Sequence, residues 1–333
     1  MHRCWWRQDF GKVNVRGCPL LDLSTIIKTI FSSSHCKTTR IYSKQITDRS
    51  ISTMNTSRVR DQDLAGKVAV VTGASRGIGR AVALNLASRG CSILGTCSST
   101  ENIAMINSLN QEIDTIFEGT ARKQKITILG ISANILSPTC AKTITNTLVE
   151  HFSSRVDIFI NNAADGRDAA LGELTVEGIQ ESLISNIQTP VLIVEEFVKR
   201  KMFQPEGRII YISSIRSRQP WSHQLMYSAG KSAGESLCRT WSQAFGGKEE
   251  EFSFMAGTTA NSVTVGLTQT DSIMKCPPDA LEDFKKEFFP LQSSPRFGQP
   301  EDVADVVGML CSRDARWITG QVISASGGGV KIG

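Results

Sequence analysis

The stretch KVAVVTGASRGIG, residues 67–79, indicates the fold of this 333-residue chain. An apolar, β-branched run ends at Thr72, three glycines (73, 77 and 79) follow, and a helical pattern then continues to Gly90, a residue type that often ends helices. Glycine permits a tight turn and lets an anion approach the N–H groups at the start of a helix. This context of strand, turn and helix predicts a site for the pyrophosphate of a dinucleotide.

Strands and helices alternate from Lys67 to the end of the chain. Helical stretches separate the apolar runs, and a long helix with a polar face is expected over residues 103–123. Parallel strands that are joined by helices form a sheet covered on both faces, which predicts an α/β fold in a single domain over residues 54–333. The expected strands are residues 67–72, 92–97, 126–132, 156–161, 208–213, 261–265 and 321–325.

Residues 1–53 differ in composition from the rest of the chain. They hold nine lysines and arginines, three aspartates and no glutamate, and they are rich in serine and threonine. Two interpretations remain open. This basic leader is a transit peptide, or it is translated sequence upstream of a true start at Met54. Under both, the leader lies outside the fold and is expected to be disordered.

Charge and cysteine content exclude several classes of function. The net charge is +5, but the leader carries +6 of it, so the body is nearly neutral and no nucleic-acid partner is expected. The nine cysteines form no CxxC pair, which argues against a zinc site and a disulfide framework. No apolar run reaches the roughly 20 residues of a membrane helix, so no membrane association is expected.

The stretch YSAGK, residues 227–231, places a phenol and an ammonium one helical turn apart. A nearby ammonium favours phenolate over phenol and lowers the pKa of a tyrosine from about 10. Such a tyrosine can give a proton to a carbonyl oxygen or take one from an alcohol. The small residues between Tyr227 and Lys231 are expected to leave room for cofactor and substrate. The alternative is an exposed helix pair without function.

Several motifs in order resemble the short-chain dehydrogenase/reductases, including 3-oxoacyl carrier-protein reductases and fungal carbonyl reductases. The resemblance covers about residues 64–333 and rests on TGASRGIG (72–79), NNAA (161–164), Asn186 in SNIQTP, ISS (212–214), YSAGK, and two C-terminal segments at 296–310 and 317–328. The family has NNAG where this chain has Ala164, and Pro-Gly where it has Val265-Gly266. The resemblance implies a doubly wound Rossmann-type sheet of about seven strands, and a homotetramer or homodimer.

The resemblance also implies roles for individual residues. Tyr227 is the proton donor, Ser214 holds the substrate oxygen, Lys231 binds the nicotinamide ribose, and Asn186 anchors a water that links Lys231 to solvent. Ser214 rather than Ser213 is favoured because it lies 13 residues before Tyr227, the family's usual separation. The implied catalytic set is thus Asn186, Ser214, Tyr227 and Lys231. The implied cofactor contacts are Gly73, Ser75, Arg76, Gly77, Ile78, Gly79, Ser98, Asn134, Asn162, Tyr227, Lys231 and Thr270.

The end of the second expected strand favours NADP(H) over NAD(H). NAD enzymes place an acid there for the ribose 2′-hydroxyl, whereas this chain has Cys97 followed by Ser98. Arg76 in the glycine turn is expected to pair with the 2′-phosphate; the alternative is a solvated loop charge. Asn134 stands where the family often has an aspartate that contacts adenine.

The sequence says less about the substrate. The loop between Ser214 and Tyr227 carries Arg216 and Arg218, which are expected either to attract a carboxylate or a carrier-linked substrate, or to be solvated. Residues 272–294 are expected to form a mobile lid whose amphipathic helix turns Leu281, Phe284, Phe288 and Phe289 toward a pocket or core. Residues 246–259 are longer than the family norm, and no function is assigned to them.

These expectations define an NADPH-dependent oxidoreductase that acts on CH–OH and C=O groups. It reduces a ketone, such as a 3-oxoacyl thioester or a secondary-metabolite carbonyl, to a secondary alcohol, and the substrate is a small molecule, free or carrier-linked. The alternatives are an NAD(P)-dependent alcohol dehydrogenase working in the oxidative direction, or a non-catalytic nucleotide-sensing protein with the same fold. The expected location is cytoplasmic, or mitochondrial if the leader is a transit peptide.

Overall fold

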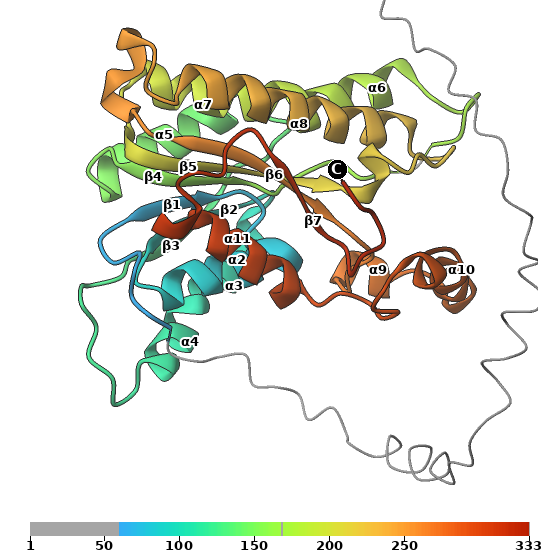
Figure 1. Ribbon diagram of the computed structural model, residues 1–333, viewed down its shortest axis with the longest axis horizontal. Coiled ribbons are helices and arrows are strands. Elements are labelled where there is room, and N and C mark those ends of the chain that lie inside the picture. Colours follow the sequence, from blue (N-terminus) through green and yellow to red (C-terminus); the bar gives the residue numbers. More distant parts are fainter. Residues whose placement is uncertain (1–59, 168, 333) are drawn as a thin grey trace, which may run out of the picture. The chain divides into compact units, whose positions relative to one another are not determined.

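One parallel sheet of seven strands organises the described part of the chain, residues 60–167 and 169–332 of the computed structural model (Figure 1). The strand order is β3-β2-β1-β4-β5-β6-β7, and every pairing is parallel. All seven expected strands are confirmed, and the leader predicted over residues 1–53 lies outside the described residues. The strands are β1 Val68–Val71, β2 Ser92–Cys97, β3 Ile128–Ser132, β4 Val156–Asn161, β5 Phe203–Ser214, β6 Thr259–Val265 and β7 Val322–Ala325.

Helices cover both faces of the sheet, as expected for strands that are apolar on both sides. One layer consists of α2 Gly77–Ser88, α3 Ile103–Asn107, α4 Leu109–Ile116 and α11 Pro300–Cys311 (Figure 1). The opposite layer consists of α5 Cys140–His151, α6 Val176–Leu183, α7 Thr189–Lys199 and α8 Leu225–Ala244. Each layer closes its own hydrophobic core against the sheet. None of the helices in the described ranges is long and apolar enough to cross a membrane.

The helix predicted over residues 103–123 is wrong in its extent. The structure has two short helices, α3 and α4, which meet at Ser108, and α4 ends at Ile116. Gly119 adopts a φ of 71°, in the left-handed region that favours glycine, so the chain turns away there. Polar side chains of these helices bind the neighbouring strand instead: Asn107 Oδ1 accepts from the Gly130 N–H, and Asn110 Nδ2 donates to the Ile128 carbonyl.

Residues 246–259 form a structural cover at the amino-terminal end of β6. They contain the 3₁₀ turn η4, Glu250–Met255, and then enter β6. Met255 is fully buried, and the Phe252 ring packs edge-on against Phe245 with ring centroids 5.2 Å apart. This segment extends the core at the end of the sheet opposite to the carboxyl ends of the strands.

Two short helices follow β6 at the carboxyl ends of the strands. They are α9 Asp271–Met274 and α10 Pro278–Phe288, followed by the 3₁₀ turn η5 Phe289–Leu291, and Figure 1 shows them beside the edge of the layered body. Two further 3₁₀ turns are η1 Thr100–Asn102, which follows β2, and η6 Arg313–Ala315, which follows α11.

The strand order fixes where a ligand can bind. After β1 the chain adds β2 and β3 on one side of the sheet, and β4 then returns to the other side of β1. Two loops therefore leave the carboxyl ends of β1 and β4 in opposite directions, which opens a crevice between them. The glycine turn follows β1, and the segment that begins at Asn162 follows β4, so the crevice lies between two of the motifs found in the sequence.

Candidate functional site

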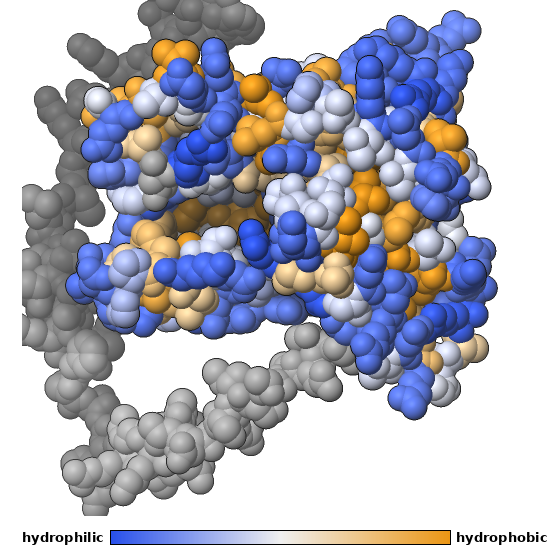
Figure 2. All heavy atoms as spheres, turned by 180° about the vertical axis from the view of Figure 1, so that it is seen from behind, coloured by the Kyte–Doolittle hydropathy of each residue, from blue (hydrophilic) through white to orange (hydrophobic). Residues whose placement is uncertain are grey.

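A cavity of about 680 Å³ occupies this crevice. Figure 2 shows its mouth as a deep cleft with hydrophilic rims and a hydrophobic interior. The lining residues come from the ends of β1, β2, β4, β5 and β6, from the start of α8, and from α9 and α10. Of the residues predicted as site residues, the cavity is lined by Gly73, Ser75, Arg76, Gly77, Ile78, Ser98, Asn162, Ser214, Tyr227, Lys231 and Thr270.

The glycine turn fits the close approach of an anion to the backbone. Gly73 has a φ of 68°, and a Cβ atom added to Gly79 would lie 2.2 Å from the Gly73 carbonyl oxygen. The turn closes so tightly because helix α2 begins directly over it. Asn162 Nδ2 holds the turn from the side, since it donates to the carbonyls of Thr72 (2.9 Å) and Gly73 (3.2 Å).

The start of helix α2 has the features of a phosphate-binding site. Arg76 is the N-cap residue, and its side chain makes no capping hydrogen bond. The first N–H groups of α2 therefore face the cavity without a side-chain acceptor, and the helix dipole favours an anion there. Thr270, the N-cap residue of α9, lies next to the turn: its Cγ2 atom is 3.4 Å from the position that a Cβ atom on Gly77 would take.

The part of the cavity at the end of β2 is lined by no carboxylate of the described residues. Cys97 and Ser98, at the end of β2, and the exposed Arg76 line it. Among the described residues, Asp271 is the one acidic side chain in the lining, and it belongs to the α9 side. Asn134 does not line the cavity: its Oδ1 atom accepts from the Leu136 N–H at 3.0 Å in a local turn.

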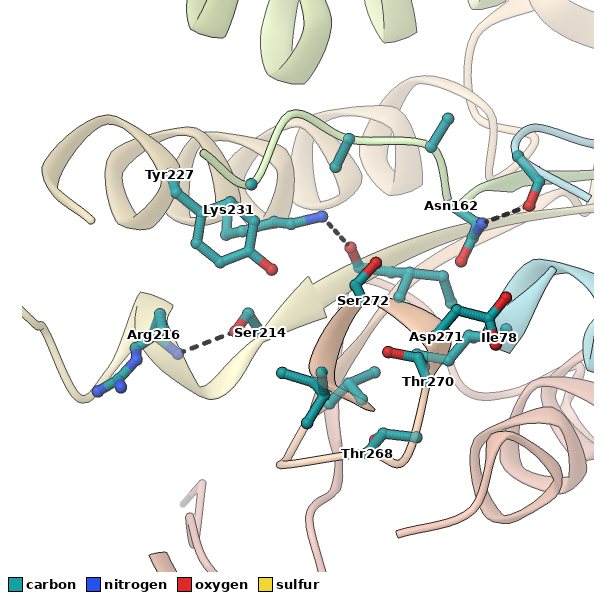
Figure 3. A pocket seen from close by; sticks show the side chains of 18 of the residues that line it. Ile78, Asn162, Ser214, Arg216, Tyr227, Lys231, Thr268, Thr270, Asp271 and Ser272 are labelled. Atoms are coloured by element: carbon teal, nitrogen blue, oxygen red, sulfur yellow. Dashed lines mark hydrogen bonds between the residues drawn. The ribbon is translucent and has the colours of Figure 1, made fainter. Parts of the chain in front are cut away.

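Tyr227 and Lys231 lie together on the wall formed by α8 (Figure 3). The Lys231 Nζ atom is 5.4 Å from the centroid of the Tyr227 ring and 5.2 Å from that of Tyr211. Lys231 is 3% exposed, and burial lowers the pKa of its ammonium group to about 7. Its Nζ atom donates a 2.7 Å hydrogen bond to the Ile212 carbonyl, which fixes the side chain against β5.

The small residues between Tyr227 and Lys231 serve a purpose that differs from the expectation. A Cβ atom on Gly230 would lie 2.8 Å from the Cβ of Asn186, so Gly230 makes room for Asn186 rather than for cofactor or substrate. The expectation for Gly230 is therefore wrong, because this face of α8 packs on the turn that carries Asn186.

Asn186 lies in a π-helical turn, η2 Ile184–Gln188, which separates α6 from α7. It is 1% exposed and does not line the cavity. Its side chain exchanges two 3.0 Å hydrogen bonds with the backbone of Asp165, in the segment after β4. The main-chain carbonyl oxygen of Asn186 accepts from the Tyr211 hydroxyl at 3.1 Å, and the centroid of the Tyr211 ring is 5.2 Å from Lys231 Nζ. Asn186 is thus linked to Lys231 through Tyr211, and its role in a water-mediated proton path stays a prediction.

Ser214 ends β5 across the cavity from Tyr227 (Figure 3). Its Oγ atom accepts a 3.2 Å hydrogen bond from the Arg216 N–H, and this bond caps the 3₁₀ turn η3, Ile215–Ser217. Ser213 has a different role, because its hydroxyl donates to Glu235 Oε1 at 2.7 Å on the buried side of the strand. The hydroxyl of Ser213 is thus engaged by Glu235, and the choice of Ser214 as the residue that contacts substrate stays a prediction.

Glu235 is a buried carboxylate that organises the base of this region. It is 1% exposed, lies one turn after Lys231 on α8, and forms an ion pair with Arg218. Its Oε1 atom is 2.7 Å from the Ser217 hydroxyl and 3.3 Å from that of Thr264 on β6. One carboxylate therefore joins β5, the η3 turn, β6 and α8.

Each of the two loop arginines has a carboxylate partner, but Arg216 is buried and Arg218 is exposed. Arg218 is paired with Glu235, and Arg216 is 6% exposed and lines the cavity. The Arg216 guanidinium lies 5.1 Å from the Trp221 ring and 4.8 Å from the Phe288 ring, and it pairs with Glu287 of α10 at 3.0 Å. The expectation of a solvated loop is thus wrong for Arg216, which is buried and pairs with Glu287, whereas Arg218 has an exposed side chain beside Glu235.

Three of these residues were not predicted from the sequence: Tyr211, Glu235 and Glu287. A signal existed for Glu235, because Tyr227, Lys231 and Glu235 follow one another at intervals of four on a single helix face. The amphipathic pattern of α10 correctly placed Phe284 and Phe288 toward the cavity, but it gave no partner for Glu287. Within the described residues, no group of three histidine, cysteine or acidic side chains is arranged to hold a metal ion.

Comparison with known proteins agrees with this geometry. A family model described as enoyl-(acyl carrier protein) reductase matches residues 73–329. A short chain dehydrogenase of Penicillium thymicola, penD, is 34% identical over 275 residues, which cover 80% of this chain and 92% of that protein. A 3-oxoacyl-(acyl-carrier-protein) reductase of Aquifex aeolicus is 30% identical over 267 residues, which cover 80% of this chain and 98% of the relative.

Among solved structures, the angucycline C-6 ketoreductase LanV with bound NADP superposes with a TM-score of 0.67. It is 29% identical, and the match covers 82% of this chain and 98% of LanV. A short chain dehydrogenase from Burkholderia cenocepacia in complex with NADP is 26% identical with a TM-score of 0.66, over 80% of this chain and 99% of that chain.

Proposed function

Because this chain belongs to the short-chain dehydrogenase/reductase family of oxidoreductases, which use a nicotinamide cofactor, we propose that it is an NADPH-dependent reductase that converts a ketone to a secondary alcohol. The observation that carries the proposal is the shared cavity. The glycine turn lies at one end of it, and Ser214, Tyr227 and Lys231 line the other. A cofactor bound at the turn would share this cavity with the serine, the tyrosine and the lysine.

The residues of the cavity fit such a cofactor. The glycine turn and the uncapped start of α2 would hold its pyrophosphate, and Thr270 and Asn162 would border it on either side. When bound, the nicotinamide supplies the hydride that reduces the carbonyl carbon.

The chain itself positions the ketone and supplies the proton. Ser214 Oγ donates to the carbonyl oxygen and stabilises the charge that develops there, while the Arg216 N–H keeps the Ser214 oxygen in place. Tyr227 gives its hydroxyl proton to the same oxygen. Lys231, held by the Ile212 carbonyl, then favours the phenolate form of Tyr227 when it carries its own proton. A lysine pKa of about 7 lets Lys231 hold and release a proton near neutral pH.

The preference for NADPH rests on the residues at the adenosine end of the cavity. Cys97 and Ser98 stand where a carboxylate would repel a 2′-phosphate, and Arg76 lies at the same end with a guanidinium that can pair with it. Two of the solved relatives, LanV and the Burkholderia protein, bind NADP. These observations support NADPH as the preferred cofactor.

The walls of the substrate end support a largely apolar ketone. Ile273, Phe284, Phe288 and Trp221 line the same cavity as Tyr227, and an apolar lining of this kind favours an apolar substrate body. One relative is a 3-oxoacyl carrier-protein reductase, and one solved neighbour is an angucycline ketoreductase. We therefore favour a 3-oxoacyl thioester or a polyketide-like ketone.

A panel of ketones, assayed with NADPH and with NADH, tests the proposal. Purified protein that starts at Met54 is incubated with 3-oxoacyl thioesters, aromatic polyketide-type ketones and small aliphatic ketones, and loss of cofactor absorbance is followed. We expect turnover of at least one apolar ketone with NADPH and a lower kcat/KM with NADH. Nucleotide binding without turnover of any ketone, or of any secondary alcohol in the reverse direction, would refute the enzymatic function.

A further inference from the structure

We propose that Arg216 is a positioning residue that couples the seating of helix α10 to the placement of the Ser214 hydroxyl. The inference rests on the proposed function, because it assigns to Ser214 the contact with the substrate oxygen. The backbone of Arg216 holds Ser214, and its side chain holds helix α10, which lines the cavity. A displacement of α10 is therefore passed on to the Ser214 hydroxyl.

The backbone contact of Arg216 is local and specific. Its N–H donates to Ser214 Oγ at 3.2 Å, as the dashed line in Figure 3 shows. The hydroxyl oxygen of Ser214 is therefore oriented by the peptide group at position 216, and its own proton is left to be donated elsewhere. A shift of the η3 turn at Arg216 would move this N–H group, and with it the Ser214 hydroxyl that the N–H group orients.

The side chain of Arg216 reaches the covering helix. Its guanidinium lies between the rings of Trp221 and Phe288, at 5.1 and 4.8 Å, and Nη1 pairs with Glu287 at 3.0 Å. Phe288 and Glu287 are the last residues of α10, whereas Trp221 lies in the loop before α8. The guanidinium is nearly buried whereas Glu287 is 44% exposed, so water and salt screen the pair from the Glu287 side only.

Helix α10 has few other attachments of this kind. Its remaining ion pairs, Glu282 with Lys285 and Asp283 with Lys286, lie within the helix itself. Among the described residues, the pair of Arg216 and Glu287 is the one ion pair that links α10 to another element. Loss of this pair should therefore loosen α10 and, through the η3 turn, the hydroxyl of Ser214.

Glu287→Gln is the decisive variant, because it removes the charge and keeps the shape of a side chain that is 44% exposed. We expect kcat/KM for the best ketone to fall about five- to tenfold, with part of the loss in kcat. Asp283→Asn is the matched control: it breaks a pair on the same helix whose two side chains are each 75% exposed, and its effect should stay below about twofold. Equal effects of the two variants would overturn the proposal.

Arg216→Met tests whether one bond carries the effect. Methionine keeps an apolar stem between the two rings and removes the charge, so the double variant Arg216→Met, Glu287→Gln should be no worse than Arg216→Met alone. Losses that multiply in the double variant would mean that the two residues act independently, which would overturn the proposal.

A second double-mutant comparison, of Glu287→Gln with Ser214→Ala, measures the coupling to Ser214. In a Ser214→Ala background, Glu287→Gln should change kcat less than it does in the native protein, because the hydroxyl that it positions is gone. A full and unchanged effect on kcat in that background would refute the coupling while leaving the proposed function intact. If Ser214→Ala itself keeps the native kcat, the role assigned to Ser214 in the proposed function fails instead.

Discussion

The ammonium group of Lys231 donates a 2.7 Å hydrogen bond to the Ile212 carbonyl, two residues before Ser214 on β5. Helix α8, which carries Tyr227, and strand β5, which carries Ser214, are therefore fastened to each other by a side chain that also belongs to the proposed site. The distance between the tyrosine and the serine depends on this bond as well as on the packing of the core.

Replacement of Tyr227 by phenylalanine should remove turnover and spare cofactor binding. The ring stays, but the proton donor is lost, and general acid catalysis contributes about two to four decades in rate. Steady-state kcat on the best ketone and NADPH affinity by fluorescence titration give the two readouts. Retention of most of the kcat would exclude Tyr227 as the proton donor.

Replacement of Lys231 by methionine should stabilise the protein without cofactor, most clearly at low pH. The folded-state pKa of about 7 lies below the ordinary value of 10.5, so folding disfavours the charged form. Between pH 7 and 10.5 the unfolded chain holds the extra proton, hence the free energy of unfolding of the native protein rises with pH in this window. Below pH 7 Lys231 is charged in both the folded and the unfolded protein, so the full cost of burying its charge lowers the free energy of unfolding.

The Lys231→Met advantage in melting temperature should accordingly be largest at pH 6 and shrink toward pH 10. Thermal unfolding of both proteins at pH 6, 8 and 10 measures it. Lys275→Met is the control, since Lys275 is exposed on the surface and its replacement should leave the pH dependence of the native protein unchanged. Parallel curves for the native protein and Lys231→Met would argue against a depressed pKa.

Replacement of Arg76 by alanine should weaken NADPH binding about ten- to hundredfold and leave NADH binding nearly unchanged, because a charge-assisted bond to the 2′-phosphate is lost. Titration with each cofactor gives both affinities. Arg80→Ala serves as the control for loss of a positive charge on α2, because Arg80 pairs with Glu112 and does not line the cavity. If both cofactors weaken alike, Arg76 does not read the phosphate.

Replacement of Glu235 by alanine should cost about 3 kcal/mol of stability, since it leaves Arg218 and several hydroxyl groups without their buried acceptor. Ser213→Ala, which removes one donor to the same carboxylate, should cost about 1 kcal/mol. Urea denaturation measures both values. Comparable small losses for the two variants would show that Glu235 is not the centre of the network.

Removal of residues 1–53 should leave melting temperature and kcat unchanged, because the leader has the composition of a segment outside the fold. Comparison of the full chain with protein that starts at Met54 tests this. Imaging of both forms in cells separates the two interpretations of the leader: a transit peptide should direct only the longer form to an organelle. A large drop in melting temperature would mean that the leader packs on the fold.

The sequence was sufficient to predict features that are formed by residues close together in the chain. The seven strands could be predicted because each is a compact apolar run, and parallel strands buried on both faces need such runs. The glycine turn and the pair of Tyr227 and Lys231 could be predicted because their spacing is set by a single turn or a single helix. In these cases, neighbours in space are also neighbours in the chain.

Other features depend on contacts between distant segments and could not be read from the sequence. Arg218 looked like a loop charge because its partner, Glu235, lies on the next helix, and Arg216 meets Glu287 71 residues away. Gly230 looked like space for a ligand, but the packing of α8 on Asn186 determines it. The 103–123 helix was overextended because a polar pattern gives no clear helix end, whereas in the structure α4 ends at Ile116 and the chain turns away at Gly119, which has a φ of 71°.

The π-helical turn at residues 184–188 has one further consequence. Such a turn holds one residue more than a regular helix would at the same place, so deletion of one residue would let α6 and α7 join as a regular helix while α7 keeps the same face toward the core. Ile193, Val194 and Phe197, each at most 2% exposed, would then stay buried, whereas the side chain of Asn186, which the turn places beside Asp165, would be displaced. The extra residue of this turn therefore serves the position of Asn186 and not the packing of α7, so its removal should alter the candidate site far more than the stability of the fold.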